Sequence, residues 1–231
     1  MLAIAGSAYM AFLPTGSFMD EEVIKTSSSE TIKNVGTGKN ALSIQQDWFV
    51  GNKVPHLEFV FLSTTRLSVT GFYLRMAPFP GFMPATEKKP EPGKHYFSFL
   101  LALLHPFSRG SVHIISSDPA VPPSIDPRIL NNKADVSLLV EAVKYARKVV
   151  RTKGLDTCVQ TEVVPGPEAQ SDLEIEAFVR KTIQTVYHPV GTASMLPREA
   201  GGVVDAHLKV YGTTNVRVVG VLSVLSRRYM L

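Results

Sequence analysis

The chain has 231 residues, of which 45% are hydrophobic, and its formal net charge is +4 at pH 7. This length and composition suit one large or two small globular domains with a real core. Lysine and arginine are spread along the chain and form no block with interleaved aromatic residues, which argues against a nucleic-acid partner. Cys158 is the only cysteine, so an intrachain disulfide and a cysteine-based zinc site are excluded, and we expect its side chain to be buried.

The N-terminal residues 1–13 are apolar and small, but they are not typical of a signal peptide. The first lysine is Lys25, and Gly6 and Pro14 interrupt the apolar run. No other stretch approaches the roughly 18 uncharged apolar residues of a membrane-spanning helix. We therefore predict no membrane span.

The next part of the chain alternates between polar segments and short apolar ones. Residues 21–52 are predicted to be polar and loop-like, and residues 36–38 to be a turn, because a dinucleotide fingerprint needs a preceding apolar strand and a third glycine. Alternating patterns predict strands over 57–62 and 70–77. The prolines between 78 and 92 predict a long exposed loop, either a lid over a site or a disordered excursion.

Two further strands and two helices are expected after this loop. The apolar run 96–104 is typical of a central strand buried on both faces, and a further strand is expected over 110–116. Helical periodicity after N-terminal capping signals predicts helices over 133–151 and 171–184. The strands follow one another in a run, which favours an α+β fold with a mainly antiparallel sheet flanked by helices.

Two histidines, His105 and His113, lie in or beside the predicted strands. His105 and His113 have no partner at metal-ligand spacing, so both are interpreted as sheet histidines, and no metal site is predicted. His188 alone would be interpreted as a structural hydrogen bonder. Its surroundings change that interpretation.

Several short motifs follow one another in the second half of the chain. They are Ser108-Arg109-Gly110-Ser111-Val112, Ser117-Asp118-Pro119, Pro123-Ser124-Ile125-Asp126-Pro127, Tyr187-His188-Pro189-Val190-Gly191-Thr192, Gly201-Gly202-Val203-Val204-Asp205 and Asn215-Val216-Arg217-Val218-Val219. In this order and at these spacings they resemble the C-terminal part of the glucose-methanol-choline (GMC) flavoprotein oxidoreductases. The resemblance is close from residue 105 to residue 219 and weak before residue 96.

The resemblance implies an FAD-dependent oxidoreductase that acts on the CH–OH group of a small alcohol. FAD would accept the hydride, and His188 would be the general base, since the pKa of a histidine lies near working pH. Tyr187 would contact the substrate. Val219 and Gly220 would contact the flavin, although Gly220 stands where the family has an aspartate.

The resemblance also implies a domain organisation. Residues 1–185 would form the substrate-binding domain, with the family's C-terminal segment beginning near 105, and residues 186–231 would be an incomplete return into the FAD-binding domain. The glycine-rich dinucleotide-binding half is expected to be missing, so we expect this chain to hold FAD weakly and to be inactive alone. Two alternatives stay open: a hydroxynitrile lyase of the same family, and a truncated non-catalytic chain that binds an apolar alcohol or a partner.

Overall fold

The computed structural model describes residues 8–31, 39–64, 96–185, 189–220 and 223. The strand expected over 70–77, the proline-rich loop over 78–92 and the turn at 36–38 lie outside these described residues.

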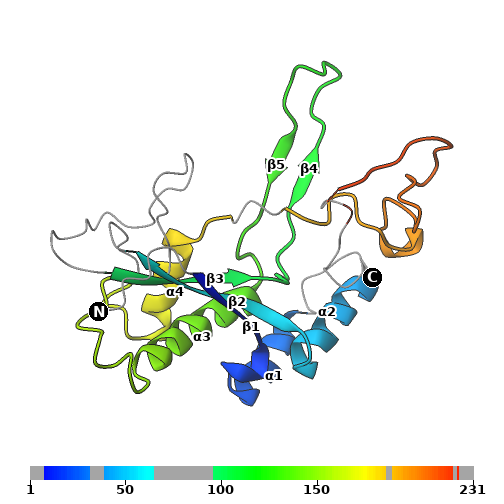
Figure 1. Ribbon diagram of the computed structural model, residues 1–231. Coiled ribbons are helices and arrows are strands. Elements are labelled where there is room, and N and C mark those ends of the chain that lie inside the picture. Colours follow the sequence, from blue (N-terminus) through cyan, green and yellow to red (C-terminus); the bar gives the residue numbers. More distant parts are fainter. Residues whose placement is uncertain (1–7, 32–38, 65–95, 186–188, 221–222, 224–231) are drawn as a thin grey trace.

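The body of the molecule contains an antiparallel sheet of three described strands in the order β1-β2-β3 (Figure 1). These are β1 (Ala8–Pro14), β2 (Pro55–Thr64) and β3 (Tyr96–Leu103). The strands predicted over 57–62 and 96–104 are confirmed. Among the described strands, β2 and not β3 has a neighbour on each side, so the prediction of a central strand over 96–104 is not met within this part of the sheet.

One face of the sheet builds the core because its apolar side chains alternate in register. Leu57 lies opposite Leu103 and Phe59 opposite Leu101, and these side chains point to the same face as Phe99. The rings of Phe59 and Phe99 are 4.6 Å apart between centroids. Burying each such side chain stabilises the fold by about 1.5–3 kcal/mol.

Helices α3 (Lys133–Val150) and α4 (Asp172–Thr182) pack together, and α3 lies against β3. Both predicted helices are confirmed. Asn132 caps α3 by accepting from the backbone N–H of Ala134, and Ser171 and Glu174 form both halves of a capping box at α4. The predicted apolar faces are mostly buried, including Val136, Leu139, Val140 and Val143 on α3 and Ile175 and Val179 on α4.

The prediction of a polar loop over 21–52 is wrong. This stretch contains α1 (Glu21–Thr31) and α2 (Lys39–Gly51), after the short 3₁₀ turn η1 (Thr15–Ser17). The inward face of α1 is made by Ile24 together with Ser27 and Ser28. The small serine side chains let α1 and α2 approach closely. Gln46 on α2 donates to the Ser28 hydroxyl at 2.7 Å. Polar residues on a packed face conceal helical periodicity.

The strand predicted over 110–116 is shorter and has another partner. β4 (Ser111–His113) pairs with β5 (Ser124–Asp126) in a separate antiparallel two-stranded ribbon, and this ribbon stands out from the body (Figure 1). Pro119, Pro122 and Pro123 lie between the two strands and cannot donate to a ladder.

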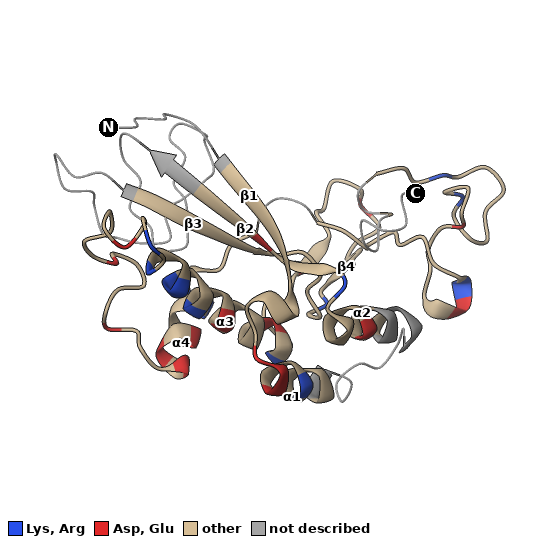
Figure 2. Ribbon diagram, turned by 60° about the horizontal axis from the view of Figure 1, so that its bottom comes forward, with Lys and Arg blue, Asp and Glu red and all other residues tan. Residues whose placement is uncertain are grey.

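Charged side chains lie on the helices and loops, whereas the described sheet is almost free of them (Figure 2). Glu58 is the one charged residue in β1, β2 and β3. The connection after α3 is anchored by Arg147, whose guanidinium donates to Glu162 at 3.0 and 2.9 Å and to the Ala169 carbonyl at 2.8 Å. Such charge-assisted, bidentate bonds are among the stronger polar contacts in proteins.

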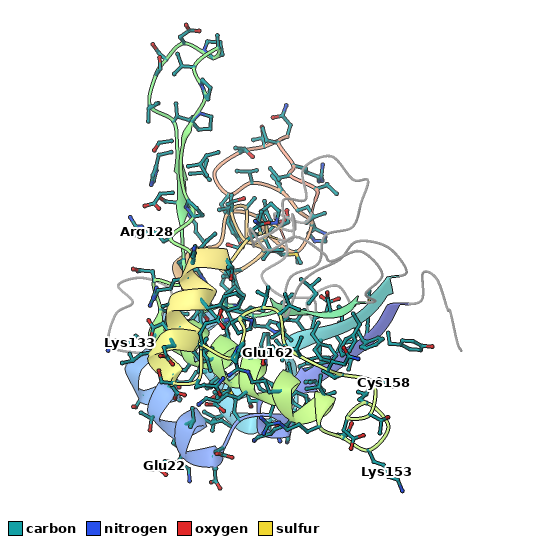
Figure 3. All side chains as sticks on the ribbon, turned by 90° about the vertical axis from the view of Figure 1, so that its left-hand side faces the viewer. Glu22, Arg128, Lys133, Lys153, Cys158 and Glu162 are labelled. Carbon is teal, nitrogen blue, oxygen red and sulfur yellow. The ribbon has the colours of Figure 1, made fainter. Side chains whose placement is uncertain are left out.

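Cys158 is exposed, so the expectation of a buried thiol is wrong. It lies in the turn after α3, at the periphery of the molecule (Figure 3). Backbone hydrogen bonds such as that from the Cys158 N–H to the Leu155 carbonyl, 2.9 Å, fold this turn outside the core.

Candidate functional site

The C-terminal motifs fold together into one lobe over 189–220 and 223. Tyr187 and His188, the predicted substrate-binding and catalytic residues, lie outside the described residues. The chain immediately after them is described from Pro189 onward. The lobe is therefore the part of the chain that directly follows His188.

Three separate motifs interleave in this lobe through backbone hydrogen bonds. The Ser194 carbonyl accepts from the N–H groups of Val203 and Val204 at 2.9 and 3.3 Å. Val204 is fully buried, and it also bridges Val210 in antiparallel fashion. Val218 closes the set by donating to the Leu208 carbonyl at 3.0 Å. Motifs that follow one another in the sequence thus fold together into a single unit.

Two glycines show why their residue type is needed. Gly191, three residues after His188, has φ of +87°, a left-handed conformation that favours glycine. Gly202 approaches the backbone so closely that a Cβ there would overlap the Leu196 carbonyl oxygen. The first glycine turns the backbone at residue 191, and the second packs its turn against the backbone of Leu196.

Asp205 has a structural role in this lobe. Its carboxylate accepts from the backbone N–H groups of Lys209 at 3.0 Å and His207 at 2.8 Å. These bonds, that from Lys209 first, lower the pKa of Asp205 and keep it ionised. The carboxylate thereby fixes the turn 205–209.

The structure brings the segment after His188 next to the predicted cofactor contacts. The Met195 N–H donates to the Ser223 carbonyl at 3.0 Å, and Ser223 folds back on the residues just before it by donating to the Gly220 and Val218 carbonyls. Val219 and Gly220 are exposed, and a Cβ at Gly220 would meet no atom within 4 Å. The chain at Met195 is therefore hydrogen bonded to the turn that follows Val219 and Gly220.

This open, small-residue edge fits one side of a flat cofactor ring. Val219 offers an exposed apolar side chain, and Gly220 offers backbone without a side chain to obstruct it. A complete FAD site would need in addition a loop that binds the phosphates of the dinucleotide.

The Ser108-Arg109-Gly110 motif is held by residues that the sequence did not point to. Asp135, in the first turn of α3, accepts from the N–H groups of Phe107 and Ser108 at 2.7 Å each. Gln45 of α2 donates to the His105 carbonyl at 2.6 Å and accepts from Arg109 at 2.6 Å. A clamp from two helices thus fixes the segment between β3 and the ribbon.

A buried histidine, His56, and the partly buried His105 lie beside this clamp. The rings of His56 and His105 are 5.3 Å apart between centroids, and Trp48 and Phe49 of α2 pack on them. His56 is fully buried, and its Nε2 has no hydrogen-bond partner within the described part of the chain. Burial lowers the pKa of His56 to about 4, so the ring is neutral. His56 lies in β2, and its sequence context gave no sign of this environment.

Among the described residues, no group of three metal-ligating side chains is clustered. In the same part of the chain, none of the helices has the length and apolar character needed to cross a bilayer.

Comparisons with known proteins assign the chain to a family. A family model described as GMC oxidoreductase matches residues 106–225. The GMC oxidoreductase family protein Mala s 12 of Malassezia sympodialis is 44% identical over 122 residues, which are 53% of this chain and 20% of that protein. Pyranose dehydrogenase 3 of Leucoagaricus meleagris is 33% identical over 172 residues, 73% of this chain and 27% of the relative.

Solved structures share the fold. A fungal aryl-alcohol oxidase superposes with a TM-score of 0.66 at 24% identity, over 94% of this chain and 34% of the solved one. An FAD-dependent oxidoreductase from Chaetomium thermophilum gives 0.65 at 20% identity, over 93% and 34%. The α+β fold is that of a region in flavoenzymes of this class. Because the family model covers more than half of it, the chain belongs to the GMC oxidoreductase family, and it spans between a fifth and about a third of the length of the relatives described.

Proposed function

We propose that this chain is the C-terminal part of an FAD-dependent oxidoreductase that acts on the CH–OH group of a small alcohol. Residues 1–185 would be its substrate-binding domain, and residues 186–231 would return toward the FAD-binding domain. The observation that supports the proposal is the hydrogen bond from Met195 to Ser223, because it joins the chain that follows His188 to the turn that follows Val219 and Gly220.

Each residue then has a role that its chemistry supports. FAD, when bound, supplies the acceptor for the hydride of the alcohol carbon. His188 takes the hydroxyl proton, and Tyr187 contacts the substrate. Gly191 bends the backbone behind His188, and the exposed Val219 and Gly220 border the flavin ring.

Proton removal by a positioned base contributes about a hundred- to ten-thousand-fold in rate. The imidazolium that His188 becomes would also hold the oxygen as negative charge develops on it. Together these effects correspond to about 3–5 kcal/mol of barrier. If the histidine were structural instead, its replacement would lower the folding stability and leave the rate of the chemical step unchanged.

The experiment uses a complete GMC relative, with alanine at the position aligned with His188. We expect the rate of flavin reduction by excess alcohol, measured anaerobically by stopped flow, to fall by at least about a hundredfold, with flavin content and melting temperature nearly unchanged. Alanine at the position aligned with Val190, which is 46% exposed here, is the control and should keep the rate. An unchanged reduction rate with a lowered melting temperature would show that the histidine is structural.

A further inference from the structure

We propose that α2 is held by an acid-sensitive latch, in which protonation of His56 releases α2 from β2 and from the segment 104–109 while α3 and α4 keep their packing. The latch consists of Gln45, Trp48 and Phe49 on α2 and of His56 and His105, against which they lie. This device does not depend on whether His188 acts as a base.

Within the described part of the chain, His56 has no acceptor for a second ring proton. Its Nδ1 lies 3.0 Å from the Val54 carbonyl, which can only accept, so Nδ1 carries the proton of the neutral ring. Its Nε2 is buried and has no hydrogen-bond partner among the same residues. A proton on Nε2 would add a positive charge at a buried place, and burying an unpaired charge is costly. Protonation of His56 therefore opposes the closed latch.

An aromatic ring and a second histidine enclose His56. The Phe49 ring lies 5.4 Å away between centroids, and the His105 ring lies 5.3 Å away. The His105 Nδ1 is 3.1 Å from the Pro55 carbonyl, so it likewise carries a proton. Burial, and to a smaller extent the charge of His105, lower the pKa of His56 to about 4 although the bond to Val54 acts in the other direction.

Charged groups on the neighbouring elements do not relieve this cost. They are Asp47 on α2, Lys53 just after it, Glu58 in β2, and Arg109 and Asp135 at the clamp. Among the described titratable groups, His105 is the one whose charge acts on the pKa of His56. Burial raises the pKa of Asp135, so protonation of this carboxyl on acidification favours the folded state and does not cause opening.

One side of α2 carries all the latch contacts of this helix. Gln45, Trp48 and Phe49 are spaced i, i+3 and i+4, so they lie on the same face. Gln45 donates to the His105 carbonyl at 2.6 Å, and Trp48 packs on the His105 ring at 5.4 Å between centroids. An opening at this face therefore also removes the α2 side of the clamp on residues 105–109.

α2 can open while the other helices stay packed. It lies on the other side of the body from α4 (Figures 1 and 2), and α3 packs against α1, α4 and β3. The Thr15 hydroxyl donates to the Phe49 carbonyl at 2.7 Å, and the Gly16 N–H donates to Oδ1 of Asn52 at 2.7 Å. These two bonds do not titrate, so they resist the opening equally at every pH.

The proton balance sets the direction of the switch. The closed form holds the pKa of His56 at about 4, whereas a ring in water titrates near 6.5, so the open form binds the extra proton. The closed form is therefore fully favoured above about pH 6.5 and is lost as the pH falls toward 4. The ratio of open to closed chains rises about twentyfold between pH 7 and pH 5, and about 300-fold at most. An opening populated at about 1% at neutral pH becomes the main state near pH 4.

The test is hydrogen–deuterium exchange of the 231-residue chain at pH 7 and pH 5, with rates corrected for the pH dependence of the chemical step. We expect the protection of the α2 amides to fall about twentyfold, while the α3 amides stay at least about tenfold better protected at both pH values. In His56→Phe, which cannot take up the proton, the protection of α2 should change by less than about twofold. The control His113→Gln removes an exposed histidine of the ribbon and should keep the fall.

Three results would overturn the proposal. Equal protection of α2 and α3 at pH 5 would mean that the whole chain unfolds and that α2 does not open by itself. Unchanged protection of α2 between the two pH values would mean that His56 does not control the helix. The same fall in His56→Phe as in the unmodified chain would assign the acid sensitivity to another group.

Fluorescence of the unmodified chain tests the latch even if His56→Phe does not fold. Trp48 is the only tryptophan, and its ring lies against His105. During acidification its emission maximum should move to longer wavelength at a higher pH than the loss of circular dichroism from the helices. The wavelength is measured because a protonated His105 would lower the intensity without any opening. Coincident transitions of the two probes would show global unfolding and contradict the latch.

Discussion

The hydroxyl of Ser108 donates to Oδ2 of Asp135 at 2.5 Å and accepts from the backbone N–H of Asn132 at 3.0 Å. In an ordinary capping box the third helical residue reaches back to the N-cap N–H itself. Here the serine hydroxyl is inserted between the two, so the start of α3 and the Ser108-Arg109-Gly110 motif stabilise each other.

Replacing Asp135 by alanine should destabilise the protein strongly. The change leaves the backbone N–H groups of Phe107 and Ser108 without their acceptor in a buried place, for which we expect a loss of about 3–5 kcal/mol in unfolding free energy. Guanidinium titration followed by circular dichroism measures it. Glu22→Gln, in the exposed first turn of α1, is the control and should change stability by less than about 0.5 kcal/mol.

The buried His56 should make stability depend on pH. Its folded pKa is lowered to about 4 by burial, while the unfolded value lies near 6.5, so between these values the unfolded chain binds the extra proton. Stability is therefore fully present above about pH 6.5 and is lost as the pH falls toward 4, by up to about 3 kcal/mol. Unfolding free energies measured at pH 7 and pH 5 test this.

The contribution of His56 is isolated by two variants. His56→Phe removes the titrating group and should flatten the loss of stability between pH 7 and pH 5, even if its stability at pH 7 is lower. His113→Gln removes an exposed histidine of the ribbon and should leave the pH dependence as in the unmodified chain. An unflattened profile in His56→Phe would mean that other groups cause the acid sensitivity.

The two glycines of the C-terminal lobe should respond differently to alanine. In Gly202→Ala the added methyl would collide with the Leu196 carbonyl oxygen, and moving that backbone should destabilise the lobe by about 2 kcal/mol or more. Gly220→Ala places its methyl in open space and should be neutral to within about 1 kcal/mol. Thermal denaturation of both variants compares them directly, and similar melting temperatures would contradict the packing described for Gly202.

The isolated chain should not retain FAD. After incubation with excess FAD and gel filtration, we expect less than about a tenth of a flavin per chain, because one open edge at Val219 and Gly220 forfeits most of the interactions that offset the loss of freedom on binding. Visible absorption of the eluted protein measures the flavin. A yellow protein with stoichiometric flavin would refute the expectation, and a complete relative treated in the same way is the positive control.

Local sequence patterns predicted the elements whose signals are local. Both α3 and α4 were predicted because capping residues and apolar periodicity coincide within each segment. α1 was missed because Ser27 and Ser28 are buried where a pattern search expects apolar residues. The pairing of β4 with β5 was missed because alternation identifies a strand but not its partner.

The candidate site was likewise predictable only in part. The motifs around His188 and Val219 were identified from sequence, and the structure adds that their flanking segments are hydrogen bonded through Met195 and Ser223. The acceptor role of Asp135 toward Ser108 was not predictable, because it joins residues that are 27 positions apart. The environment of His56 depends likewise on α2 and on His105, just after β3, which come from elsewhere in the chain.

The order of strands in the sheet bears on how the chain acquires its fold. Ala8 pairs with Leu62, and Leu57 pairs with Leu103, so each strand meets its partner only across a long stretch of sequence. Non-local pairing of this kind slows folding, because the entropy of closing the loop is lost before the contacts form. During synthesis β1 would leave the ribosome long before β2, with Tyr9, Met10 and Phe12 bare on an unpaired edge. A chaperone that shields this strand until Thr64 has been made would keep its free edge from pairing with another chain.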